Sequence, residues 1–228
     1  MALDSFGPET LSSDSIEILQ TRILEWGKEH PRSFFWRERK LEPYESLIVE
    51  VLLARTRAES VEPVAQEFIE RFPKPADLRE ADRAEVEDVI RPLGLFRKRA
   101  KALIECGRKL TEELGGRIPR DVDRLQLLPY VGRYAANAIL CFGAGQVRPV
   151  VDANVARVFQ RYFDLREPKS KLENDELYWE VAAQLVSEEN TRLYNWSLLD
   201  LGAAICTPQS PGCKRCPMEK ACHFPQNQ

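Results

Sequence analysis

Four of the six cysteines lie within the last 23 residues, and they are Cys206, Cys213, Cys216 and Cys222. Gaps of six, two and five residues separate them, which is short enough for all four thiolates to meet around one centre. Proline and glycine in the gaps give the backbone a turning path that suits this convergence. Four thiolates bind zinc or an iron–sulfur cluster. Structural zinc sites more often use two Cys-x-x-Cys units and this loop has one, so the chemistry favours a cluster while zinc stays open.

A carboxylate, Glu50, interrupts the apolar run from Leu47 to Ala54. Burial disfavours the charged form of a carboxyl group and raises its pKa, which suits a proton donor near neutral pH. The alternative is a buried ion pair, for which Arg37 or Arg55 could supply the guanidinium.

A second carboxylate, Asp152, follows Pro149-Val150-Val151 and precedes an expected helix. Aspartate is a favoured N-cap residue and needs no catalytic role at such a position. A carboxylate among apolar neighbours could equally serve as an electrostatic group in a reaction. The residues alone leave both interpretations open.

The segment Leu128-Pro129-Tyr130-Val131-Gly132-Arg133 has the character of a tight turn that leads into a helix. Backbone N–H groups at such a turn and helix start form an anion site that suits phosphate. Contacts of this kind position a protein on nucleic acid without reading its sequence. An ordinary turn between helices is the alternative.

Together these features resemble the helix-hairpin-helix DNA glycosylases of the endonuclease III/MutY superfamily, over roughly residues 34–224. In that family a C-x6-C-x2-C-x5-C loop at the end of a helical domain holds a [4Fe–4S] cluster. The resemblance therefore implies such a cluster on the four cysteines, with Lys214 and Arg215 facing DNA phosphate. It also implies DNA contacts from Val131, Gly132 and Arg133, although Tyr130 stands where the family usually has glycine.

The resemblance also assigns catalytic roles. Asp152 matches the aspartate that stabilises the cationic sugar or orients the attacking water, and Asn154 matches a polar residue that holds it. Glu50 matches the glutamate that assists departure of the flipped base in MutY and related mismatch glycosylases. Endonuclease III enzymes carry a nucleophilic lysine where this chain has Tyr134, which cannot form an imine. We therefore expect a monofunctional glycosylase that uses water and lacks AP-lyase activity.

Substrate choice rests on a further resemblance. Arg55 matches an arginine of the archaeal-type thymine/uracil mismatch glycosylases, and Leu95 lies where the family places an apolar wedge. The expected reaction is excision of thymine or uracil mispaired with guanine, by a monomer acting on double-stranded DNA with a flipped base. A MutY-like adenine glycosylase acting opposite 8-oxoguanine or guanine is the main alternative. A non-catalytic DNA-binding protein and a zinc-stapled interaction domain are the others.

These residues must be positioned by helices, because apolar residues recur at helical spacing and no segment alternates with period two. The expected fold is all-α, with two helical lobes flanking a DNA cleft. We expect a flexible N-terminus (1–14), a six-helix-type lobe with the hairpin (30–133), and a second lobe (15–29 plus 134–228) that carries the cluster loop (206–222). The expected helices are 15–29, 43–56, 61–72, 82–90, 97–114, a short turn after 123, 134–142, 155–163, 173–188 and 193–205.

Composition limits the function classes. The chain has 228 residues, 43% of them hydrophobic, so it can bury a core. It lacks a secretory signal pattern and an apolar run near ~18 residues, which predicts a cytoplasmic, nucleoid-associated protein. The net charge of -3 disfavours a partner held by bulk attraction, although phosphate responds to local patches. Basic residues gather at 97–101 and 214–220, and each group is interpreted as a solvated face.

Overall fold

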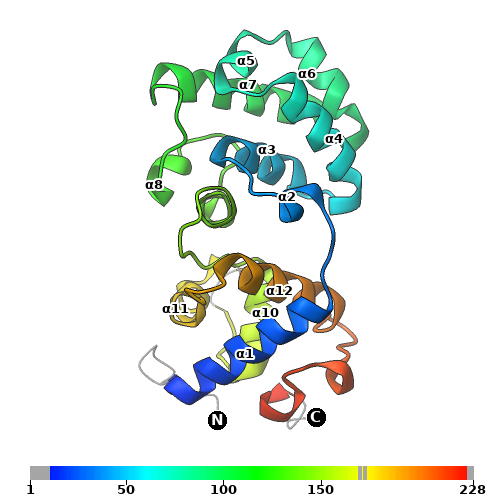
Figure 1. Ribbon diagram of the computed structural model, residues 1–228, viewed down its shortest axis with the longest axis vertical. Coiled ribbons are helices and arrows are strands. Elements are labelled where there is room, and N and C mark those ends of the chain that lie inside the picture. Colours follow the sequence, from blue (N-terminus) through cyan, green and yellow to red (C-terminus); the bar gives the residue numbers. More distant parts are fainter. Residues whose placement is uncertain (1–10, 169–170, 172–173, 225–228) are drawn as a thin grey trace. The chain divides into compact units, whose positions relative to one another are not determined.

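The computed structural model describes residues 11–168, 171 and 174–224, and within these ranges the regular structure is helical with no strand. The all-α prediction is therefore confirmed for this part of the chain (Figure 1). The α-helices are α1 (Ser13–Glu29), α2 (Phe35–Glu38), α3 (Pro43–Leu53), α4 (Ala58–Arg71), α5 (Pro75–Glu80), α6 (Arg83–Ile90), α7 (Phe96–Glu112), α8 (Val122–Leu125), α9 (Arg133–Ala138), α10 (Ala153–Phe163), α11 (Glu176–Leu185) and α12 (Thr191–Ala204).

The chain forms two compact units with separate cores. Residues 33–146 make one, called here the hairpin unit, and residues 1–32 with 147–228 make the other, called here the cysteine unit. The sequence places the second boundary after residue 133, whereas the structure places it after 146. The reason is that α9 and the π-helical turn after it, Ile139–Gly143, pack against α3 of the hairpin unit. Of the expected flexible N-terminus, residues 1–10 lie outside the described ranges, and Ser13 already begins α1.

Helix α3 is the centre of the hairpin unit because almost all its side chains are apolar. Leu47, Ile48 and Leu52 are fully buried, and the helix contacts α4, α7 and α9. Its first turn has Pro43 at a position where the missing N–H costs nothing. Gly143 lies so close that an added Cβ would come within 2.8 Å of the Pro43 Cα. A glycine is therefore needed there to dock the π-helical turn on α3.

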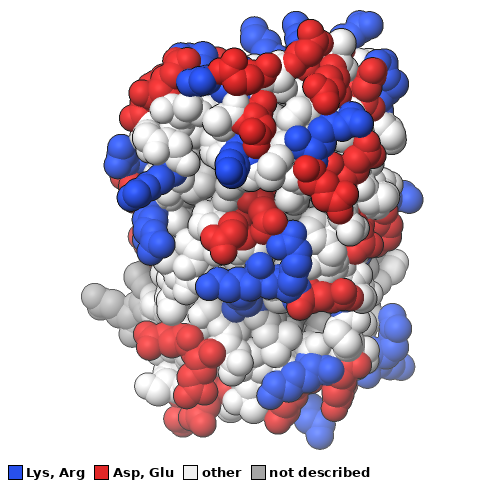
Figure 2. Space-filling view, turned by 45° about the horizontal axis from the view of Figure 1, so that its top comes forward, with Lys and Arg blue, Asp and Glu red and all other residues white. Residues whose placement is uncertain are grey.

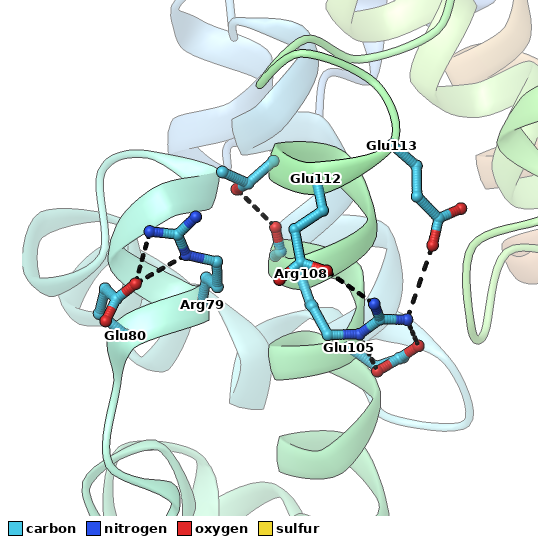
Figure 3. Close-up of polar contacts among 8 residues, drawn as sticks. Arg79, Glu80, Glu105, Arg108, Glu112 and Glu113 are labelled. Carbon is cyan, nitrogen blue, oxygen red and sulfur yellow. Dashed lines mark hydrogen bonds and ion pairs between the residues drawn. The ribbon is translucent and has the colours of Figure 1, made fainter.

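Helix α7 has an apolar inner face and a charged outer face, and it packs against a helix that the sequence did not predict. Its inner face buries Leu103, Cys106 and Leu110, and its outer face carries ion pairs centred on Arg108 (Figure 3). Exposed pairs of this kind add little stability. Helix α5 packs along α7 but is absent from the expected helices. It begins at Pro75, a residue type that both begins and ends helices.

In the cysteine unit α12 packs against α1 and α10, and α11 contacts α10 and α1. The core includes the fully buried side chains of Leu19, Tyr178 and Leu201. Helix α1 approaches α12 at Gly27, where an added Cβ would lie 1.8 Å from the Ser197 Oγ. The cysteine loop follows α12 directly and closes this unit. Among the described residues, no helix combines the length and apolar character needed to cross a membrane.

Candidate functional site

Glu50 is buried on the third turn of α3, with 7% of its surface exposed. Its Oε2 atom has no hydrogen-bond partner among the described residues. Loss of hydration raises the pKa of Glu50 to about 8, and burial is the sole cause of this shift. A neighbouring guanidinium would lower the pKa instead, so the proposed ion pair with Arg37 or Arg55 does not account for the site. The carboxyl group is therefore protonated at neutral pH, as the sequence predicts.

Tyr134 lies on α9, one of the helices that contact α3. It is half-buried in the first turn of α9, against the core of the hairpin unit, and α9 contacts α3. The structure thus brings Glu50 and Tyr134 onto two contacting helices of one unit. Asp152 belongs to the cysteine unit.

Asp152 is the N-cap of α10, and its carboxylate is held by three hydrogen bonds. Oδ1 accepts from the backbone N–H groups of Asn154 and Val155, both at 2.8 Å. Oδ2 accepts from the Asn154 side-chain amide at 2.8 Å. Burial raises the pKa of Asp152 above its ordinary value, while these hydrogen bonds act in the opposite direction. The capping role is therefore real, and it fixes the carboxylate in one orientation without excluding a role in a reaction.

Arg157 connects this carboxylate to the cysteine loop, and sequence reasoning missed it. The guanidinium is 9% exposed and donates to the Asn154 Oδ1 at 2.8 Å, to the Cys206 carbonyl at 2.8 Å and to the Gly202 carbonyl at 2.8 Å. Gly202 has no room for a side chain, since an added Cβ would lie 2.8 Å from the Asn154 Cβ. The side chains of Asn154 and Arg157 thus connect Asp152 to the first cysteine of the loop.

The hairpin keeps a tight turn despite Tyr130. This residue adopts φ 65°, the left-handed conformation that glycine would adopt without strain. The Val131 N–H donates to the Leu128 carbonyl at 3.2 Å, and the Val131 side chain is buried. Val131 therefore contributes to the turn and the core, and phosphate contact at Gly132 and Arg133 stays a prediction. Gly132 is exposed and caps α9 in an extended conformation.

Arg55 and Leu95 are both exposed in loops of the hairpin unit. Leu95 has 51% of its surface exposed, although it is a large apolar residue. Both residues adopt left-handed backbone conformations, with φ 59° for Arg55 and φ 51° for Leu95. Bulky residues adopt this conformation only where the surrounding structure enforces it. The exposed side chain of Leu95 therefore does not belong to the core of the hairpin unit.

The four loop cysteines line one pocket that is partly open to solvent. None of these four thiols forms a disulfide. Cys106 and Cys141 lie elsewhere and are fully buried. The pocket wall is otherwise mostly apolar and includes Leu201 and Met218. Among the described residues no three His, Cys, Asp or Glu side chains form a group that could hold a single metal ion. A [4Fe–4S] cluster binds each thiolate to a different iron atom, so four cysteines around an apolar pocket suit it.

Arg161, on α10, lines the same pocket and holds the cysteine loop through hydrogen bonds. It donates to the Cys206 Sγ at 3.5 Å and to the carbonyls of Thr207 and Pro208 at 2.7 and 2.8 Å. Its guanidinium also lies 4.4 Å from the ring centroid of Phe224. Lys214 and Arg215 are exposed in the short helical turn Cys213–Arg215, consistent with their prediction as solvated basic residues. On the face in Figure 2, basic and acidic side chains are interspersed, in keeping with the small net charge.

Comparison with known proteins places these features in one family. The family model for the HhH-GPD superfamily of base excision DNA repair proteins matches residues 48–184. A thymine-DNA glycosylase from Aeropyrum pernix is 34% identical over 95% of this chain and 98% of its own length. The solved structure of a thermostable thymine-DNA glycosylase superposes with a TM-score of 0.84 at 33% identity, over 93% of this chain and 97% of its own. An adenine DNA glycosylase from Mus musculus is 36% identical over 96% of this chain and 44% of its own.

The predicted family is thus confirmed. The matched region contains Glu50, the hairpin, Tyr134 and Asp152, while the cysteine loop follows it. The chain belongs to the helix-hairpin-helix GPD superfamily of base excision DNA repair proteins.

Proposed function

We propose that this protein is a DNA glycosylase that excises thymine or uracil mispaired with guanine, the first step of base excision repair. The observation that carries the reaction type is Glu50, a buried carboxyl group with a pKa raised to about 8. The thymine-DNA glycosylase relatives support the choice of base, because they match this chain over nearly their full length. The proposed partner is duplex DNA containing the mismatch, bound by a monomer.

The proposed reaction breaks the bond between the sugar C1′ and the base nitrogen, and a water oxygen then bonds to C1′. Protonated Glu50 donates its proton towards the departing base, which would otherwise leave as an anion. The Asp152 carboxylate stabilises the positive charge that develops on the sugar, or orients the water and accepts the proton that the water loses. Tyr134 has no amine to form a Schiff base, so the base is released, an abasic sugar remains in the DNA and the strand stays intact.

Recognition requires the base to leave the helical stack, because a stacked base cannot reach buried carboxyl groups. A mismatched thymine is weakly stacked, which lowers the cost of flipping and gives some selectivity. Arg55 and Leu95 are proposed to enter the duplex at the gap. Gly132, Arg133 and the exposed pair Lys214 and Arg215 are proposed to contact phosphate, which positions the protein without reading sequence.

We propose that the four cysteines hold a [4Fe–4S] cluster. Such a cluster can cross-link the loop and can also exchange an electron at a potential set by its surroundings. The chain's own contribution is to supply four thiolates and to hold the loop through Arg157 and Arg161. A brown protein with broad absorption near ~400 nm and about four iron atoms per chain is expected. Colourless protein with stoichiometric zinc would instead identify a zinc-stapled loop.

The deciding experiment is single-turnover base release from matched duplexes that contain T·G, U·G, A·G or A·8-oxoguanine. Release of thymine and uracil is expected. Release of adenine alone would establish the second candidate, an adenine glycosylase. The 36% identity to the mouse adenine DNA glycosylase is the observation that favours this candidate. Binding without release from any duplex would point to a non-catalytic DNA-binding protein. Borohydride trapping of a covalent protein–DNA adduct would contradict the absence of lyase activity.

A further inference from the structure

Arg99 is a buried arginine whose hydrogen bonds all go to two loops. It lies in the first turn of α7 with 1% of its surface exposed. Its Nη1 donates to the carbonyls of Leu93 and Gly94, both at 3.1 Å. Its Nη2 donates to the Ala54 carbonyl and to the Thr56 Oγ1, the latter at 2.6 Å. The sequence predicts a solvated basic face at residues 97–101. For Arg99 that prediction is wrong, because its side chain is buried.

The electrostatics of Arg99 are unfavourable for a purely structural residue. Burial is the main influence on this guanidinium and lowers its pKa, and its Nε has no hydrogen-bond partner among the described residues. Its partners within these residues are carbonyl oxygens and a hydroxyl, with no carboxylate. Burying a charge without an opposite charge is costly. An apolar residue would fill the same space at a lower cost in free energy. Packing alone therefore does not explain an arginine at this position.

Those hydrogen bonds surround the two residues with strained backbones. Ala54 and Thr56 flank Arg55, which has φ 59°. Gly94, with φ 68°, precedes Leu95, which has φ 51°. The Arg99 backbone N–H also donates to the Leu95 carbonyl, at 3.1 Å. One planar guanidinium with several fixed donors thus ties both loops together, which a flexible ammonium group could not do in the same way.

We propose that Arg99 is a positioning residue that holds Arg55 and Leu95 in fixed conformations before DNA binds. This inference rests on the proposed function, in which those two side chains enter the gap left by the flipped base. Groups already fixed in the bound conformation lose little freedom on binding, so the energy of inserting them is kept for extruding the base. The left-handed backbone keeps both residues at the surface, and Arg99 prevents each loop from relaxing.

The test compares Arg99→Met, which keeps an unbranched apolar side chain of similar length, with Arg99→Lys, which keeps the charge and loses the fork. Arg83→Met is the control, since it removes an exposed arginine from a surface ion pair. Single-turnover uracil release is measured on a U·G duplex and on a single strand, where no base needs to be flipped. We expect Arg99→Met to lose about tenfold or more on the duplex and much less on the single strand, with only partial rescue by lysine.

Two results would overturn the proposal. An equal loss of rate on both substrates would indicate a general folding defect. An unchanged rate on the duplex would show that the hydrogen bonds of Arg99 are not needed. Hydrogen exchange gives a second measurement that needs no activity. Peptides covering residues 53–57 and 91–96 are expected to exchange faster in Arg99→Met, with the core of α3 unchanged. If the wild-type protein releases no base, the proposed function fails. Unchanged hydrogen exchange in both peptides of Arg99→Met would separately refute the positioning role of Arg99.

Discussion

Replacing Glu50 by glutamine removes the ionisable group and keeps the shape of the side chain. The pKa of Glu50 rises from 4.5 to about 8 through burial, so the folded protein binds this proton more tightly than the unfolded chain does. Below pH 4.5 both states are protonated and the group has no effect. As the pH rises towards 8, the wild-type protein loses stability, because the unfolded state releases the proton first. Glutamine has no such dependence.

The magnitude follows from the two pKa values. Each unit of difference corresponds to about 1.4 kcal/mol, so the penalty is about 3 kcal/mol at pH 7 and approaches 5 kcal/mol above pH 8. The stability advantage of Glu50→Gln over the wild type is expected to grow by these amounts from acid to alkaline pH. Base release is expected to fall about 100-fold or more, because the amide cannot donate a proton to the leaving base.

Urea unfolding followed by circular dichroism at pH 5, 7 and 9 measures the stability difference. Glu45→Gln is the matched control on the same helix. Burial opposes ionisation of Glu45, but hydrogen bonds from Arg39 and the Glu42 N–H leave its pKa lowered. Its substitution should therefore cost stability at neutral pH, and this cost should shrink as the pH falls. A Glu50→Gln stability difference that does not change with pH would refute the reasoning.

Three further substitutions test the cysteine unit. Asp152→Asn should slow single-turnover base release by about 100-fold or more while duplex binding in a gel-shift assay is kept, and an unchanged rate would remove Asp152 from the reaction. Gly202→Ala places a Cβ 2.8 Å from that of Asn154, so we expect a lower melting temperature, from a cost of about 1–3 kcal/mol, and slower base release. Arg157→Met leaves the carbonyls of Cys206 and Gly202 without their donor, which should cost about 3 kcal/mol in urea unfolding and lower the iron content. Wild-type stability and iron content in that variant would contradict the proposed link.

The sequence alone determined the helical fold, the cysteine loop and the environment of Glu50. A carboxylate within an apolar run of a helix must be carried into the core by its neighbours, so its burial could be read locally. The spacing of the four cysteines is likewise a local property. Family membership followed from such local motifs. Two short helices were missed, since α2 has a single turn and Pro75 marks a beginning as well as an end.

Only the tertiary structure decided what the arginines do and where the units divide. Arg99 lies among other basic residues, so nothing local separates it from a solvated side chain. Arg157 lies in an apolar run, but that run does not tell which groups the guanidinium contacts. Most of their partners are backbone carbonyls, up to 49 residues away for Arg157 and Cys206. The division after residue 146 depends on the docking of Gly143 on Pro43, a contact across 100 residues. Hydrogen bonds to carbonyls leave no mark on sequence pattern, because every residue has a carbonyl group, and so the positioning of the site had to come from the fold.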